Sequence, residues 1–595
     1  MTGTVRRAVR RGSAVAVLAL ALVGTGAAPA FAHAVIQSSD PPQGAAFDTS
    51  PKTVTLRFSE SVEASLGAVR VYDQRGHRID TTRPVHPGGG SSVVQVSLPS
   101  LRNGSYVVTW RVTSADAHPV RGAFTFRVGP SASGANVSGL ATRLLSSAGG
   151  SRVVGALLAA ARFAIFAALA LLVGGAGFLV LAWSAGRFSH PAVRLVWVGW
   201  VALLGSTAIA FALQGPYAAA LPLRDMLRPG VLADVWHTRY GHVAVLRLAL
   251  LVLAVPLLRM LLPPRGRPPS EYPLPSWWPA VGALVGAGLV LTPGLAGHAS
   301  TGSWVPFALA SDAVHVGAMS LWLGGLVMLL MVLFPRRELY ELSTAVPRFS
   351  RIALLSVSAL VATGAYQTWR QVGSLHAAVT TDYGGILVLK LLGFVALVVL
   401  GAFSREVVNR RYLEPAEVVW FGVGAAAAED GGGANPPDDY RLDDYRLDEE
   451  TAVHRLKRTV GAEVVLAVIV LTLTALLVNT APARGLEQGA FVGTLKSSKV
   501  WFDVVVTPVR AGANELHLTA VSPTGGIADP PSVGVELSQP SRGIAPIKVT
   551  LRRLGPGHYV SAGLQIPFPG DWQLAIKALA SETDEVTARK TIAVR

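Results

Sequence analysis

Eight long apolar segments constrain the fold of this chain more than any other feature of its sequence. Each reaches about 20 residues, the length at which a helix crosses the hydrocarbon layer of a bilayer. They lie at roughly 153–183, 194–214, 242–262, 277–297, 306–334, 351–371, 384–403 and 460–479. Charged residues make up only 15% of the chain, whereas soluble proteins contain about 25%. The sequence therefore predicts an eight-helix α transmembrane bundle embedded in a lipid bilayer.

The positive charges give these helices an orientation. The formal net charge is +16, which in a soluble protein would suggest nucleic acid as a partner. Here the arginines gather in alternate loops, and basic loops favour the cytoplasmic side of a membrane. The loops after the first, third, fifth and seventh spans carry Arg187, Arg194, Arg265, Arg267, Arg336, Arg337, Arg348, Arg405, Arg410 and Arg411. We expect these loops in the cytoplasm, and we expect no nucleic-acid partner.

Residues 1–32 have the pattern of a secretory signal peptide. Four arginines precede a short apolar stretch, and Ala30-Phe31-Ala32 forms a small-x-small cleavage pattern. Cleavage after Ala32 makes His33 the first residue of the mature chain and places the next domain outside the cell. The competing interpretation is an uncleaved amino-terminal anchor.

Two regions flanking the membrane part alternate polar and apolar residues in the manner of β-strands. They cover residues 33–130 and 488–595, and Gly, Pro, Asn and Asp interrupt the runs. This pattern predicts an antiparallel β-sandwich in each region. Residues 131–152 form a Ser/Gly/Ala-rich linker to a transmembrane domain at 153–480. Eight spans place both sandwiches on the external, periplasmic side of a multi-pass protein of the plasma membrane.

The last cytoplasmic loop, residues 405–458, has a different composition. It contains a glycine run at 431–433 and a tandem Asp-Asp-Tyr-Arg-Leu-Asp repeat at 438–448. Charged, glycine-rich segments of this kind are typical of solvated, disordered chain. We expect a disordered loop without chemistry of its own.

One group of residues outside the membrane has the composition of a metal site. The chain has no cysteine, so a metal must be bound by His, Met, carboxylate or amine groups. A mature His33 offers an α-amine and an imidazole, while Asp116 and His118 share one face of an extended segment. An amine, two imidazoles and a carboxylate suit Cu(II). His77 and His86 lie in expected loops, and we interpret them as solvated.

The sequence around these ligands resembles a known family. His33-Ala34-Val35-Ile36 is followed in order by residues 39–45, 56–60 and Asp116-Ala117-His118-Pro119. Together these motifs resemble the periplasmic copper-binding family CopC. The resemblance implies a cupredoxin-like or immunoglobulin-like sandwich that binds copper, with His33, Asp116 and His118 at the positions of the family's ligands. The methionine-rich Cu(I) loop of some members is missing.

The other parts of the chain carry weaker resemblances. Residues 315–326 and 383–391 are similar to the membrane copper-resistance family CopD, and this likeness extends over roughly 150–480. The carboxy-terminal domain faintly resembles YtkA-like external β domains. No metal motif accompanies that likeness, and we expect His517 and His558 to be structural or exposed.

Within the membrane part, four residues form a candidate copper route. Asp312, His315 and Met319 stand at i, i+3 and i+7 on one helix face, and His298 lies just outside the preceding span. Ionisable residues inside a span are functional candidates, and His with Met suits copper, including Cu(I). The competing interpretation is a packing histidine with a filler methionine. Weaker candidates near the external boundary are His237, His242 and His376.

An internal repeat adds two buried cations. Thr238-Arg239-Tyr240-Gly241 precedes Arg247, and Thr381-Asp382-Tyr383-Gly384 precedes Lys390, each cation six residues after the glycine. The parallel sense suggests a duplicated membrane unit. A cation within a span requires a polar interior or a partner, for which Asp234 and Asp382 are the candidates.

These features predict a copper-handling membrane protein that is not an enzyme. The external domain binds Cu(II) at the mature amino terminus, and the helical domain mediates copper transport, uptake or homeostasis. No phosphate-binding loop with a lysine occurs, which disfavours ATP-driven pumping. The alternatives are a membrane haem oxidoreductase, which a Soret band would reveal, a copper oxidoreductase that uses the amino-terminal histidine, and a structural module with an incidental histidine.

Overall fold

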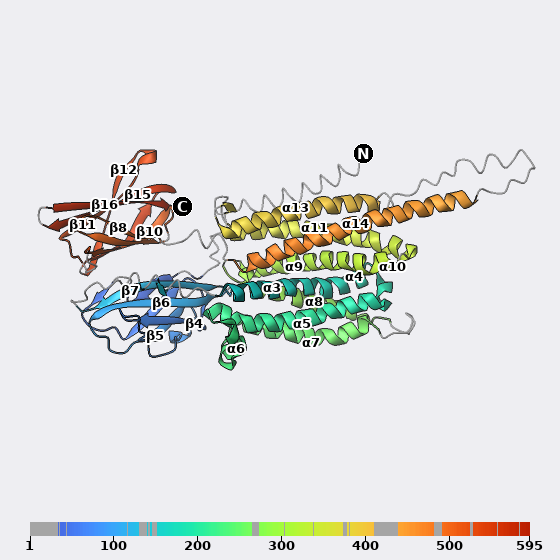
Figure 1. Ribbon diagram of the computed structural model, residues 1–595, viewed down its shortest axis with the longest axis horizontal. Helices are drawn as coiled ribbons and strands as arrows, with labels where there is room; N and C mark the ends of the chain where they lie inside the picture. The colour runs from blue at the N-terminus through green and yellow to red at the C-terminus, as the bar shows by residue number, and fades with distance from the viewer. Residues whose placement is uncertain are drawn as a thin grey trace, which may run out of the picture.

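The fold combines two β-sandwiches with one helix bundle (Figure 1). The computed structural model describes residues 34, 36–42, 45–115, 117–129, 140, 143–144, 151–263, 273–302, 304–336, 338–372, 378–379, 381–409, 438–480, 491–507, 509–523, 528–555, 557–581 and 584–594. The expected signal peptide, His33, Asp116, His376 and most of the expected linker lie outside the described residues. The predicted fold class is confirmed.

The amino-terminal sandwich packs two sheets around an apolar core. One sheet has the order β1 (Ile36–Asp40), β3 (Thr53–Phe58), β5 (Val93–Ser97), and the other has β2 (Ala46–Phe47), β7 (Pro119–Val128), β6 (Gly104–Ser114), β4 (Val62–Tyr72). Strand β3 buries every second residue, as expected for a sheet with one face on a core. Leu56, Phe58 and Phe126 are fully buried between the sheets.

Eight helical spans in the described residues are long and apolar enough to cross a membrane. The first runs through α3 (Arg152–Leu169), η2 (Ala170–Gly174) and α4 (Gly175–Leu181). It is followed by α5 (His190–Ala219), α7 (Arg239–Leu261), α8 (Trp278–Leu295) and α9 (Val305–Met328), which continues through η7 (Leu329–Leu333) and α10 (Phe334–Arg336). The last three are α11 (Leu339–Val372), α13 (Asp382–Val408) and α14 (Asp438–Val478). The predicted number of spans is confirmed.

Glycines bring the first and fifth spans together. A Cβ on Gly174 would lie 1.8 Å from the carbonyl oxygen of Ser320, and one on Gly324 would lie 2.1 Å from that of Ala170. No side chain fits at either position, so the two backbones touch. Small residues commonly allow such close packing between membrane helices.

Helix α14 differs from the expectation of a disordered loop over 405–458. The helix begins at Asp438 and includes the whole tandem repeat, and α13 extends to Val408. Residues 438–458 contain no proline or glycine, so nothing in the backbone stops a helix there. The prediction of disorder is therefore wrong for this part, while residues 410–437 lie outside the described residues.

The carboxy-terminal domain is a second sandwich. Its first sheet has the order β13 (Arg552–Gly555), β14 (His558–Ile566), β10 (Gly512–Val521), β9 (Trp501–Thr507), β8 (Phe491–Lys496). Its second sheet has the order β12 (Ile544–Val549), β11 (Ser532–Gln539), β15 (Gly570–Ser581), β16 (Asp584–Val594). Trp572 is fully buried between them.

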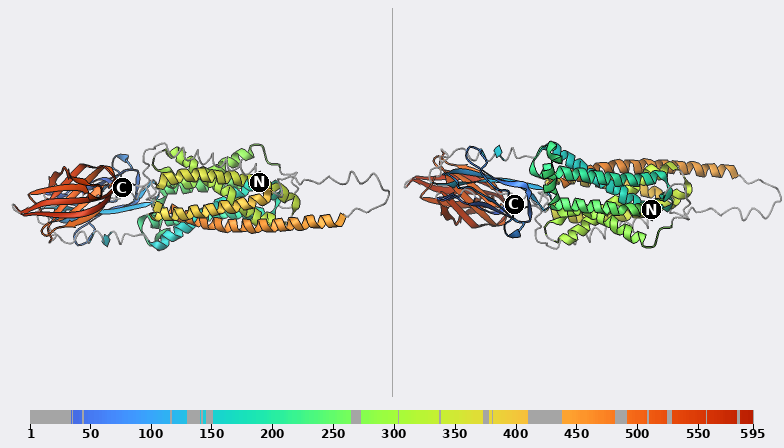
Figure 2. Two further views of the ribbon diagram at one scale, coloured as in Figure 1. Left: turned by 90° about the horizontal axis from the view of Figure 1, so that it is seen from above. Right: turned by 90° about the horizontal axis from the view of Figure 1, so that it is seen from below.

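Both sandwiches lie at the same end of the bundle (Figures 1 and 2). The short helix α6 (Pro229–Trp236) lies at that end too, whereas α10 lies at the other end, beyond which α14 extends. The arrangement is the one that eight spans require when both β domains share one side of a membrane.

The orientation leads to a labelling prediction. The chain contains no cysteine, so a single introduced cysteine reports its own side of the membrane. We expect a membrane-impermeant maleimide to label Lys548→Cys, an exposed position in β12, in intact cells. We expect it to label Gly432→Cys only after lysis. Labelling of both positions in intact cells would contradict the proposed orientation.

Candidate copper site and membrane cavity

The amino-terminal sandwich docks on the bundle through the ends of two helices. Arg111 donates to the carbonyl oxygens of Ala218 (2.6 Å) and Tyr217 (2.9 Å), in the last turn of α5. Gln214 donates to the carbonyl oxygen of Ala117 (3.3 Å). The last carbonyls of a helix have no partner within the helix, so an arginine satisfies them well. Burial lowers the pKa of Arg111, although arginine stays charged at neutral pH.

The turn between β6 and β7 carries His118 into this contact. The backbone N–H of Ser114 donates to the carbonyl oxygen of His118 (2.9 Å), and Ala117 adopts a left-handed conformation with φ of 67°. His118 is buried, and its Nε2 donates to the carbonyl oxygen of Val478 (3.0 Å), at the end of α14. A hydrogen bond of this kind fixes the orientation and the tautomer of the imidazole.

His118 also lies against a histidine of the membrane domain. Its ring is nearly parallel to that of His298, at 16°, with the ring centres 4.8 Å apart. His298 begins the 3-10 turn η6 (His298–Ser300) between α8 and α9. Arg370 of α11 holds this turn by donating to the carbonyl oxygens of His298 (2.9 Å) and Thr301. The structure thus brings together two predicted residues 180 positions apart in the sequence.

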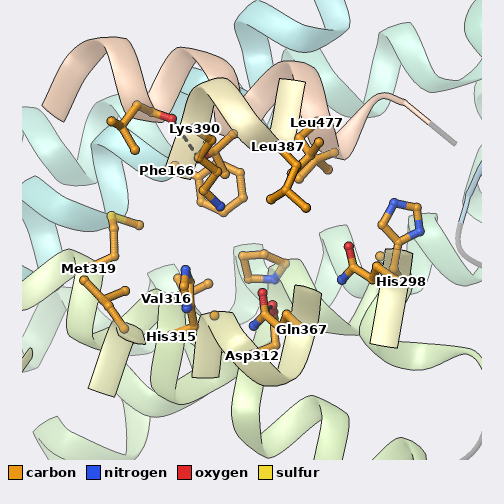
Figure 3. Close-up of a pocket in the computed structure, with 18 of the residues that line it drawn as sticks. Phe166, His298, Asp312, His315, Val316, Met319, Gln367, Leu387, Lys390 and Leu477 are labelled. Atoms are coloured by element: carbon orange, nitrogen blue, oxygen red, sulfur yellow. Dashed lines mark hydrogen bonds between the residues drawn. The ribbon is translucent and has the colours of Figure 1, made fainter. Parts of the chain in front are cut away.

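The two histidines line a cavity of about 910 Å³ within the bundle, and Figure 3 shows His298 at one side of it. Most of its wall is apolar and comes from α3, α9, α11, α13 and α14. All four candidate route residues line it, and the remaining charged or amide side chains in its wall are Arg162, Arg247, Gln367, Gln371 and Lys390. A few polar groups in an apolar wall are typical of a binding cavity.

Asp312, His315 and Met319 share the cavity-facing side of α9, as their spacing predicts (Figure 3). Gln367 of α11 donates to Oδ1 of Asp312 (3.3 Å). A Cβ on Gly294 would lie 2.5 Å from Oδ2 of Asp312, so the glycine makes room for the carboxylate against α8.

A threonine orients His315. Its Nδ1 lies 2.9 Å from Oγ1 of Thr363, whose hydroxyl donates to the carbonyl oxygen of Ala359 (2.6 Å). One hydroxyl donates one hydrogen, so Thr363 accepts from Nδ1–H of His315. The lone pair of His315 therefore lies on Nε2, the nitrogen available to a ligand.

The internal repeat has a common structural basis at two helix starts. Thr238 caps α7 by accepting from the N–H of Gly241 (3.1 Å), and Thr381 caps α13 by accepting from the N–H of Gly384 (3.0 Å). Threonine is a preferred residue for this role. The matching caps support a duplicated unit.

The two cations of the repeat line the cavity, as expected, but neither uses the expected aspartate partner. Arg247 donates to Oγ1 of Thr292 (2.8 Å). Lys390 extends into the cavity opposite α9 and attracts Asp312 (Figure 3). When the partner of a buried cation lies on a distant helix, it cannot be predicted from the residues that are close to the cation in the sequence.

Of the three predicted copper ligands, His118 is described, whereas His33 and Asp116 lie outside the described residues. Among the described residues, no group of three or more His, Asp or Glu side chains is arranged to hold a metal ion. His77 is 74% exposed beside Asp73, as expected. His86 instead contacts the carbonyl oxygen of Val93 through Nδ1 (2.7 Å).

Sequence reasoning missed Gln367, Thr363, Arg370 and Arg162, which orient or flank the candidate residues. Their position could have marked them as candidates, because polar side chains within apolar spans often have a function. Their partners, however, emerge only from the packing of helices.

Family profiles match most of the chain. Residues 36–129 match the CopC domain, residues 153–305 match the copper resistance protein D-like N-terminal domain, and residues 343–477 match copper resistance protein D. These are families of copper resistance rather than of enzymes. Asp312, His315 and Met319 fall in the interval between the two membrane profiles. The YtkA-like resemblance of the last domain stays a prediction.

Individual relatives agree with these matches. The copper transport protein CutJ of Bacillus subtilis is 27% identical over 384 residues, which is 62% of this chain and 67% of that protein. Copper resistance protein C of Escherichia coli is 32% identical over 120 residues, 19% of this chain and 94% of that protein. The crystal structure of CopC from Methylosinus trichosporium OB3b has 31% identity, covers 16% of this chain and 95% of that one, and gives a TM-score of 0.16.

Proposed function

Since the chain belongs to the copper resistance family as a CopC–CopD fusion, we propose that it captures Cu(II) outside the cell and passes copper into its membrane cavity for uptake. One observation carries this proposal. The predicted copper ligand His118 lies directly against His298, at the edge of the cavity in the bundle. The proposed capture site and the proposed transport cavity are therefore adjacent.

The capture site consists of His33, Asp116 and His118. An α-amine, two imidazoles and a carboxylate form the hard, nitrogen-rich set that Cu(II) prefers. The hydrogen bond from Nε2 of His118 to the carbonyl oxygen of Val478 supports the proposal, because ligand histidines commonly donate their other nitrogen to such an acceptor. The same bond ties the capture site to the end of a transmembrane helix.

The transport path runs along α9. From Asp312 to Met319 the helix rises about 10 Å, so His298, Asp312, His315 and Met319 form a series leading from the sandwich into the bundle. The ligands along this path are imidazole, carboxylate and thioether groups, all of which occur as copper ligands. Asp312 offsets the positive charge of Lys390 across the cavity, which reduces the repulsion of a copper cation.

The capture site makes a prediction about the position of His33. Inserting one Gly before His33 keeps its imidazole but moves the α-amine and breaks the short chelate ring. We expect this insertion, Asp116→Ala and His118→Ala each to weaken Cu(II) binding by orders of magnitude. Competitive Cu(II) titration of the purified full-length protein measures the effect.

The control for this experiment is His77→Ala, which removes an exposed imidazole from the same domain. It should bind Cu(II) as the unmodified protein does, and circular dichroism should show an intact β fold in all variants. If the Gly insertion leaves the affinity unchanged, the amino-terminal site is wrong and His77 or His86 must be reconsidered.

The path along α9 makes a separate prediction. His315→Ala and Met319→Ala should each lower copper accumulation in cells severalfold at equal protein level, because each removes a ligand from the cavity wall. Matched controls are His190→Ala, at the exposed start of α5, and Met331→Ala, which is 59% exposed on η7. Unchanged accumulation in both cavity variants would favour a packing role.

A further inference from the structure

The carboxy-terminal sandwich contains two histidines, and the sheet places them side by side. His517 of β10 is paired with Val560 of β14, and His558 of β14 is paired with Thr519 of β10. Residues two apart on a strand share a face, so both imidazoles lie on the same face of this sheet, one diagonal step apart.

Their ring nitrogens are unusual. The ring centres are 5.9 Å apart, with an angle of 25° between the planes, and His558 is only 3% exposed. Nδ1 of His517 and Nε2 of His558 are both buried, and neither has a hydrogen-bond partner among the residues that the structure describes. A buried polar atom without a partner costs about 1–3 kcal/mol. Two such atoms on neighbouring rings call for an explanation.

The other contacts prepare these rings to bind a cation. Oε1 of Glu515 lies 3.1 Å from Nε2 of His517, so the carboxylate accepts from Nε2–H and leaves the lone pair on Nδ1. A carboxylate behind a histidine is the usual arrangement at metal sites. On the other ring, the buried Nε2 of His558 has no competing hydrogen-bond partner among the described residues.

We propose that His517 and His558 bind one Cu(I) ion between them, as a second copper site separate from the capture site and the cavity. A metal–nitrogen bond of about 2 Å on each side, with about 1 Å more from each nitrogen to its ring centre, separates two ring centres by about 6 Å. The observed ring-centre distance of 5.9 Å leaves room for an ion between the two rings.

The number of ligands available at this histidine pair indicates which metal ion it binds. Within the described part of the chain, no third His, Asp or Glu completes a metal-binding group here. Zn²⁺ in structural sites takes four ligands, whereas Cu(I) is stable between two neutral nitrogens in a linear arrangement. Glu515 stays behind His517 as a positioning residue. The assignment does not rest on the proposed path along α9.

An anaerobic titration of the full-length protein with Cu(I), against a chromogenic chelator, tests this site. We expect His517→Ala and His558→Ala each to bind one equivalent of Cu(I) fewer than the unmodified protein. The matched control is His77→Ala, which should retain the full stoichiometry. Adding His517→Ala to a His118→Ala or a His315→Ala background should remove the same one equivalent as it does from the unmodified protein, which separates this site from the proposed capture and transport functions.

The buried position of His558 requires a second variant. His517 has a side chain that is 25% exposed, so His517→Asn changes the site with little effect on the core, and the thermal midpoint of the protein checks the fold. Loss of one equivalent in a folded His517→Asn protein supports the site. Full Cu(I) stoichiometry in that variant, or occupation of the pair by Zn²⁺ in preference to Cu(I), would overturn the proposal.

Discussion

Hydrogen bonds to the carbonyl groups at the ends of two helices determine how the amino-terminal sandwich packs on the helix bundle. The last carbonyls of α5 and α14 have no partners within their helices and carry partial negative charge. Arg111 donates to those of α5, and His118 and Arg162 both donate to that of Val478 in α14 (3.0 Å each). The sandwich therefore docks by capping helices, and its docking contact contains a predicted copper ligand.

This docking gives the cavity its chemical character. An apolar cavity within a bundle has no affinity for a cation, but the docked turn brings an imidazole to its edge, and α9 continues with a carboxylate, an imidazole and a thioether. The flanking helices α7 and α13 begin with the same threonine cap and supply the cations Arg247 and Lys390. The two repeated helix starts thus each supply one cation to the same cavity.

Local patterns in the sequence predicted much of this architecture. Apolar length identified all eight spans, and the spacing of Asp312, His315 and Met319 identified one helix face. Three-dimensional partners could not be predicted in this way. Arg247 was expected beside an aspartate, yet it binds Thr292. The part of helix α14 that precedes the predicted span at 460–479 was missed, because a charged composition suggests disorder although helix formation requires only a compatible backbone. The pairing of His517 with His558 depends on strand register.

The central claim is that copper passes directly from the sandwich to the membrane cavity through the contact of His118 with His298. The most direct test compares copper accumulation in cells that express the unmodified protein or His298→Ala at equal level, together with Cu(II) binding by each purified protein. The account predicts that His298→Ala lowers accumulation to that of cells without the protein while Cu(II) affinity is unchanged. Unchanged accumulation in the His298→Ala cells would contradict it.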